Sequence, residues 1–161
     1  MKDILEGIVS AKNRSGFEYW MSKRAGRCMP SRGDIDPAEF TELLPNVILI
    51  DVKHDPLDFR YRLIGTVIDA HTNEPMTGRW LSSIPHQRDP SRIWSACKRV
   101  VDEQIAHSSD VPYVGPMNDF VVSEDILMPL SDDGETVDMI FVVVDYLREA
   151  DLPQNPAENK S

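Results

Sequence analysis

Two pairs of β-rich runs, each joined by a short turn, constrain the fold of this chain most strongly. The first pair comprises residues 47–52 and 59–64, with a turn around Asp55 and Pro56. The second pair comprises residues 120–130 and 137–146, with a turn that contains Gly134. Such turns join antiparallel neighbours. The sequence therefore predicts two hairpins, and residues 111–114 add a further short strand.

Helical patterns precede and separate these strands. Asp36 and Asp89 each stand before a proline, a pairing typical of helix starts; they predict a short helix to Leu44 and a longer central helix to about His107. A short helix is expected from Thr66 to about residue 71. Apolar residues that include Ile4, Leu5, Ile8 and Val9 indicate two N-terminal helical pieces, or one kinked helix, with an interruption at residues 15–16.

This order of elements predicts an α+β domain. A five-stranded antiparallel sheet with helices on one face, preceded by an N-terminal helical segment, is the simplest arrangement that buries the apolar runs. A cavity is expected between sheet and helices. We divide the chain into an N-terminal helical extension (residues 1–26), a main domain (27–150) and a flexible tail (151–161).

The charge of the chain argues against several classes of partner. Its 161 residues include 27 acidic and 17 basic side chains, for a formal net charge of −10. Scattered lysines and arginines in such an acidic chain argue against binding to nucleic acid or to an anionic membrane. No apolar run is long enough for a membrane span or a secretory leader. We therefore expect a cytoplasmic protein.

The chain resembles a known family in several motifs. The longest matches are Met29-Pro30-Ser31-Arg32-Gly33-Asp34-Ile35-Asp36-Pro37 and Arg60-Tyr61-Arg62-Leu63-Ile64-Gly65-Thr66, with further matches around Tyr19-Trp20 and Met128-Pro129-Leu130-Ser131. These residues are similar to the PAS domain family, and most closely to the short stand-alone bacterial PAS proteins. The resemblance spans roughly residues 17–145.

The resemblance implies a PAS-like fold and a sensor or signalling role, usually as a homodimer. Our leading hypothesis is a module that binds a small molecule, a signalling protein or both, without catalytic output of its own. The alternative is a ligand-free PAS scaffold for protein interaction, and a small enzyme is a distant third. The sequence lacks nucleotide-binding glycine motifs and a serine elbow, and it identifies no cofactor.

The expected ligand position is between the sheet and the helices of the main domain. Strand alternation places Tyr61 and Leu63 on one face, and helical spacing places Cys97 and Val101 opposite them. The predicted lining is Tyr61, Leu63, Val67, His71, Cys97 and Val101. Apolar walls with a phenol and an imidazole as polar groups suit a small-molecule pocket. The alternative is that these side chains simply fill the core.

Arg60 and Arg62 share the other face of the same strand and are candidate anion contacts, if that face is covered. The alternative is a solvated or Asp-paired face. The histidines have no metal-ligand spacing, so no metal site is expected, and His71 is better explained as a surface or capping residue than as a haem ligand.

The N-terminal residues Ile4, Leu5, Ile8 and Val9 have no obvious place in the central sheet. We therefore expect them to pack between two chains of a homodimer.

Overall fold

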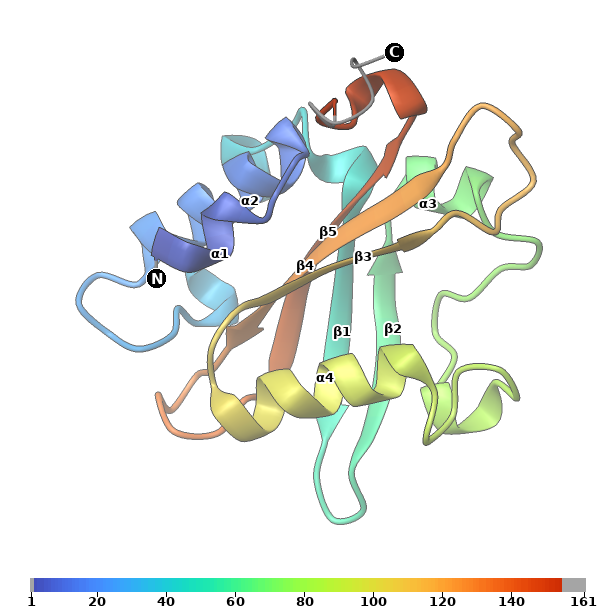
Figure 1. Ribbon diagram of the computed structural model, residues 1–161. Coiled ribbons are helices and arrows are strands. Elements are labelled where there is room, and N and C mark those ends of the chain that lie inside the picture. Colours follow the sequence, from blue (N-terminus) through green and yellow to red (C-terminus); the bar gives the residue numbers. More distant parts are fainter. Residues whose placement is uncertain (1, 155–161) are drawn as a thin grey trace.

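The computed structural model describes residues 2–154. Five antiparallel strands form one sheet in the order β2-β1-β5-β4-β3 (Figure 1). Their bounds are β1 Val47–Lys53, β2 Asp58–Ile64, β3 His107–Pro112, β4 Val122–Leu130 and β5 Met139–Leu147. The two predicted hairpins are β1–β2 and β4–β5, and the predicted five-stranded antiparallel sheet is confirmed.

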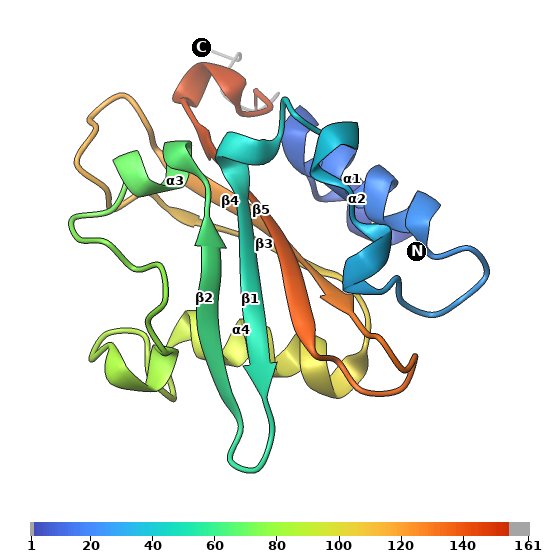
Figure 2. The same ribbon diagram turned by 180° about the vertical axis from the view of Figure 1, so that it is seen from behind.

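Helices cover both faces of this sheet, and the two α-helices of the main domain share one face (Figure 2). The α-helices are α1 Lys2–Glu6, α2 Ala11–Lys23, α3 Thr66–Ala70 and α4 Arg92–Glu103. Short 3-10 turns complete the structure: η1 Arg32–Asp34, η2 Pro37–Glu39, η3 Leu44–Asn46, η4 Leu81–Ser83 and η5 Glu149–Asp151. Part of the predicted flexible tail, residues 155–161, lies outside the described residues.

Two apolar cores result. The core beneath α3, η4 and α4 contains Phe59, Trp94 and Cys97, and the Phe59 and Trp94 rings meet edge to face at 5.0 Å. The core beneath α2 contains Phe17 and Trp20 against strands β1, β4 and β5. The Trp20 Nε1 donates to the carbonyl of Pro129 at 2.9 Å, which satisfies its one buried donor.

The N-terminal segment differs from the expectation of a break at residues 15–16. Helix α2 runs through Gly16 without a break. The helix lies so close to the sheet here that a Cβ at this position would stand 2.6 Å from Cγ2 of Val143. The glycine therefore permits close packing and does not end the helix. The break falls at residues 7–10, between α1 and α2.

A buried carboxylate holds the start of α2 on the sheet. Glu124 of β4, 3% exposed, accepts hydrogen bonds from the amides of Val9 (2.8 Å) and Ser10 (2.9 Å) and from Nδ2 of Asn13 (3.0 Å). Ser10 caps the helix by accepting from the amide of Asn13 and donates its hydroxyl to Asp145 of β5. These contacts fix α2 to both strands.

This packing gives the N-terminal apolar residues a place within their own chain. Ile8 is buried, and Ile4 and Leu5 are half-buried against the same core, while Val9 is 39% exposed. We expected a dimer because these residues had no obvious place on the sheet, and that reason no longer holds. The dimer itself stays a prediction.

Two further helices differ from expectation. Asp36 caps Ala38 as predicted, but η2 ends at Glu39. The ring of Phe40, the next residue, turns into the core 4.9 Å from that of Tyr19, so no helix continues from there to residue 44. Helix α4 ends early because Gln104 is left-handed (φ 56°), and His107 begins β3 instead of ending the helix.

A bulge in β2 reverses the expected facing of one predicted site residue. Ile50 pairs with Tyr61, but its neighbour Leu49 pairs with Leu63, so Arg62 is the extra residue. Beyond a bulge the side-chain alternation shifts by one. Leu63 therefore lies on the α2 side, 41% exposed, and not beside Tyr61 as the alternation predicts.

Candidate functional site

An aromatic cluster surrounds His71, the residue that caps the C-terminal end of α3. Its ring stacks on Tyr146 of β5 with centroids 3.7 Å apart. Tyr113 and Phe120, from the two ends of the β3–β4 loop, meet the imidazole edge to face at 5.4 and 5.0 Å. The cluster thus joins α3, the β3–β4 loop and the end of β5.

A hydrogen bond joins this histidine to Tyr113 of the β3–β4 loop. Tyr113 Oη accepts from the amide of Met117 (3.3 Å) and lies 2.6 Å from Nδ1 of His71, to which it can donate its own proton. Nδ1 is then the acceptor, so the proton of the neutral ring is on Nε2. Burial lowers the pKa of His71 and raises that of Tyr146, so both rings are neutral at pH 7.

Two clefts flank the His71–Tyr146 stack, and both residues line each of them. The first, which we call the terminal cleft, has about 590 Å³ and extends to Lys12 at the start of α2 and to Arg148. The second, which we call the histidine cleft, has about 500 Å³ and lies on the α4 side, where Gln87 lines it. The stacked rings form the wall between them.

The histidine cleft carries several polar groups without a partner. Within residues 2–154, the hydroxyls of Ser123 and Tyr146 and the Nε2 of Gln87 make no hydrogen bond to protein. Among the described lining residues, Glu74 is the only acidic side chain, and none is a lysine or an arginine. Glu74 pairs with Arg79 at 3.2 Å. The cleft therefore combines aromatic surface with neutral polar groups, the usual composition of a small-molecule site.

The six sequence-predicted lining residues are only partly brought together. Tyr61 and Cys97 are buried in the core beneath α4, and Val101 is half-buried at its edge. Val67 lines the terminal cleft, and His71 lines both clefts. Tyr61 reaches the histidine cleft indirectly, because its hydroxyl bonds Gln87.

The two candidate anion contacts share one carboxylate. Both Nε and Nη2 of Arg60 bond Oδ2 of Asp51, at 3.1 and 2.8 Å, and Nε of Arg62 bonds Oδ1 at 2.8 Å. Arg60 also lies over the Trp80 ring, 5.3 Å from its centroid. The pair is thus the Asp-paired face that the sequence left as the alternative.

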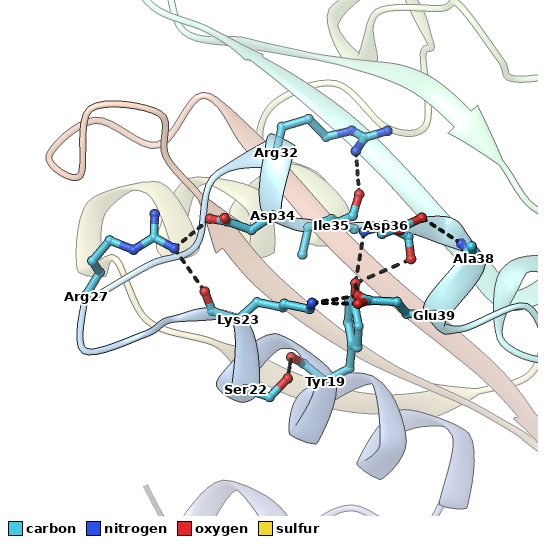
Figure 3. A network of polar contacts seen from close by, with 10 residues as sticks. All are labelled: Tyr19, Ser22, Lys23, Arg27, Arg32, Asp34, Ile35, Asp36, Ala38 and Glu39. Carbon is cyan, nitrogen blue, oxygen red and sulfur yellow. Dashed lines mark hydrogen bonds and ion pairs between the residues drawn. The ribbon is translucent and has the colours of Figure 1, made fainter.

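The longest motif of the resemblance forms a polar network that ties residues 24–39 to α2 (Figure 3). Tyr19 Oη accepts from the amide of Asp36 at 2.9 Å and donates to Glu39 at 2.6 Å, and Lys23 pairs with the same carboxylate at 2.7 Å. Hydrogen bonds from Ser31 and Arg27 lower the pKa of Asp34 to about 2. These contacts give Ser31, Asp34 and Asp36 of the motif a structural role.

Neither metal nor membrane chemistry gains support. No three His, Cys, Asp or Glu side chains in the described part of the chain gather as a metal site would require. Among the same residues, no helix has the length and apolar character needed to cross a membrane.

Sequence reasoning missed four site residues: Gln87, Tyr113, Phe120 and Tyr146. Tyr113 and Phe120 stand at the two ends of a segment rich in glycine, proline and asparagine, and Tyr146 ends the last strand. Aromatic residues at both ends of a loop between paired strands are brought together by the pairing itself. That spacing was the available signal for Tyr113 and Phe120, whereas Tyr146 and Gln87 had none.

Comparison with known proteins identifies the family. A PAS domain family profile matches residues 9–144. No curated protein matches the chain. Among solved structures, a sensory box sensor histidine kinase from Vibrio cholerae is 16% identical, with a TM-score of 0.47, over 68% of this chain and 90% of that one. Because the family profile spans well over half of the sequence, the chain belongs to the PAS domain family.

Proposed function

We propose that this protein is a PAS sensor module that binds a small molecule in the histidine cleft and signals through a protein partner, without catalysis of its own. PAS domains are typically sensor or signalling modules. The observation that carries the proposal is the set of unpartnered polar groups on Gln87, Ser123 and Tyr146 around one partly apolar cleft. Unfilled hydrogen-bonding groups beside aromatic walls favour a ligand.

The cleft is placed to report occupancy. His71 caps α3, Tyr113 lies in the β3–β4 loop and Tyr146 lies in β5, so a molecule bound against them contacts three parts of the fold at once. A ligand shifts a conformational equilibrium only by its differential affinity for the two states. Contacts to the β3–β4 loop, which carries the exposed Val114 and Met117, are the route by which such a shift would reach a partner.

A ligand-free scaffold remains the second candidate, and one observation favours it. The interior between the sheet and α4, where the sequence predicted a ligand, is occupied by side chains such as Phe59, Trp94 and Cys97. Interiors filled in this way leave no room for a buried ligand. The two candidates therefore differ in whether the more open histidine cleft is occupied.

Native mass spectrometry of protein purified without unfolding tests the proposal. We expect the wild type to retain a small molecule, and Ser123→Phe, which fills the histidine cleft, to lose it while keeping its circular dichroism spectrum. Ala11→Phe, on the terminal cleft, is the control and should retain the molecule. Absence of a bound molecule from the wild type favours the scaffold, and retention by Ser123→Phe places the ligand elsewhere.

A further inference from the structure

We propose that the ligand of the histidine cleft is a neutral, flat molecule that presents a hydrogen-bond acceptor, as a heterocyclic amide does, and that Gln87 donates to this acceptor. The inference rests on the proposed function, since it names the ligand class for the same cleft. It depends on how Tyr61 orients the Gln87 side chain, on the charge of the cleft and on its aromatic walls.

Tyr61 fixes which end of the Gln87 amide faces the cleft. The phenol is buried, 6% exposed, and its oxygen lies 2.7 Å from Oε1 of Gln87. A buried phenol has one proton, and donating it to the amide oxygen satisfies it, whereas accepting from the amide nitrogen would leave that proton unpaired. The Nε2 group is therefore directed away from Tyr61.

The backbone of Gln87 is also held in place. Its amide donates to the carbonyl of Ile84 at 2.9 Å, and its carbonyl accepts from the hydroxyl of Ser91, the residue that caps α4. With its side-chain oxygen and both backbone groups engaged, the remaining polar atom is Nε2, which has no acceptor among residues 2–154. An amide nitrogen only donates, so the bound molecule must supply an acceptor.

The charge of the cleft selects against an anion. The described lining residues include no lysine or arginine. Apart from the tyrosines, the titratable side chains of the cleft are Glu74, which is paired with Arg79, and the imidazoles of His71 and His86. Burial lowers the pKa of His71, so its ring contributes no positive charge at pH 7. An anionic ligand would lose its hydration without a counterion, which costs more than the same loss for a neutral molecule.

The walls favour a flat ring. His71, Tyr113 and Tyr146 present aromatic surface, and the thioether of Met76 adds a polarizable apolar contact. Aromatic edges and faces pair well with another ring, and sulfur packs well against one. A volume of about 500 Å³ accommodates a two-ring heterocycle with its amide.

Isothermal titration calorimetry with two matched probes tests the ligand class. Quinoline-2-carboxamide and quinoline-2-carboxylate share one ring system and differ in the charge of the substituent. We expect the wild type to bind the amide at least about tenfold more tightly than the carboxylate. Gln87→Glu keeps an acceptor for Tyr61 but presents an oxygen to the cleft, and should weaken amide binding at least about tenfold. Gln154→Glu makes the same change at an exposed position and should bind as the wild type does.

Two further variants keep the test decisive. If Gln87→Glu fails to fold, Gln87→Met removes the donor at similar length and should show the same loss. Tyr61→Phe leaves Gln87 intact but frees its amide to rotate, and should weaken binding of the amide probe by about two- to fivefold without restoring binding of the carboxylate.

The outcomes separate this inference from the proposed function. Equal binding of both probes, tighter binding of the carboxylate, or unchanged amide binding by both Gln87 variants overturns the ligand class. If neither probe binds at millimolar concentration while native mass spectrometry shows a retained molecule, the ligand class is wrong and the proposed function stands. If no molecule is retained and neither probe binds, both are wrong.

Discussion

His71 lies nearly face to face with Tyr146, with ring centroids 3.7 Å apart and planes 25° from parallel. This contact joins the end of α3 to β5, and it divides the open space at this end of the sheet into two clefts. The proposed ligand binds on one side of this wall, in the histidine cleft.

The first prediction concerns pH. Burial lowers the pKa of His71 below its ordinary value of 6.5, so the unfolded chain takes up the proton first. The stabilisation from the neutral ring is therefore complete above pH 6.5 and is lost as the pH falls from there towards the lowered value. His71→Phe keeps an aromatic stack but cannot titrate.

Urea unfolding at pH values from about 7.5 to about 5.5 measures the effect. The wild type should lose more free energy of unfolding over this range than His71→Phe does. His107, whose pKa burial also lowers, contributes equally to both proteins, so the difference between their slopes reports His71 alone. Parallel slopes would show that His71 titrates as it does in the unfolded chain.

A second prediction tests the close approach of α2 to the sheet. Gly16→Ala should lower the free energy of unfolding by about 1–3 kcal/mol, because the new Cβ would stand 2.6 Å from Val143. Gly7→Ala, at a position with nothing within 4 Å, is the matched control and should change stability by less than about 0.5 kcal/mol. Chemical denaturation of both variants checks this, and equal effects would contradict the packing.

The buried anchor at Glu124 gives a third prediction. Glu124→Gln replaces one acceptor oxygen with a donor that faces backbone amides, and should cost about 2 kcal/mol of stability. Hydrogen exchange should rise just before α2, where one of the amides of Val9 and Ser10 loses its acceptor. Glu18→Gln on the exposed side of the same helix should behave as the wild type does.

The bulge in β2 supplies a fourth prediction. Leu63→Ala should lower the free energy of unfolding by less than about 1 kcal/mol, because this side chain is 41% exposed. Leu127→Ala removes a similar side chain that is 1% exposed and should cost about 2–5 kcal/mol. Comparable losses in the two variants, measured by urea unfolding, would place Leu63 in the core and contradict the bulge.

The sheet could be predicted because its strands and turns have recognisable patterns in the local sequence. In each hairpin a turn, with Pro56 in one and Gly134 in the other, joins two β-rich runs. The two runs on either side of a turn are therefore expected to pair with each other. The register within a hairpin cannot be predicted from the local sequence in the same way. One extra residue at Arg62 reverses the facing of Leu63 without changing composition or length of the run, so alternation alone could not find it.

The site was harder to predict, because its residues come together only through the tertiary fold. His71 was named from its position after the second strand, but Tyr113 and Tyr146 reach it by strand pairing across residues far apart in sequence. Gly16 shows the same limit: the residue reads as a helix break until the neighbouring strand is in view. Local propensity yields to packing at such positions.

A crystal structure of the wild type, purified without unfolding and with quinoline-2-carboxamide supplied if no molecule is retained, is the most direct test of the central claim. The account predicts electron density for a neutral ring in the histidine cleft, with an acceptor within hydrogen-bond distance of Nε2 of Gln87 and the Tyr61–Gln87 bond preserved. A ligand bound in the terminal cleft, or a histidine cleft that holds only water, would contradict it.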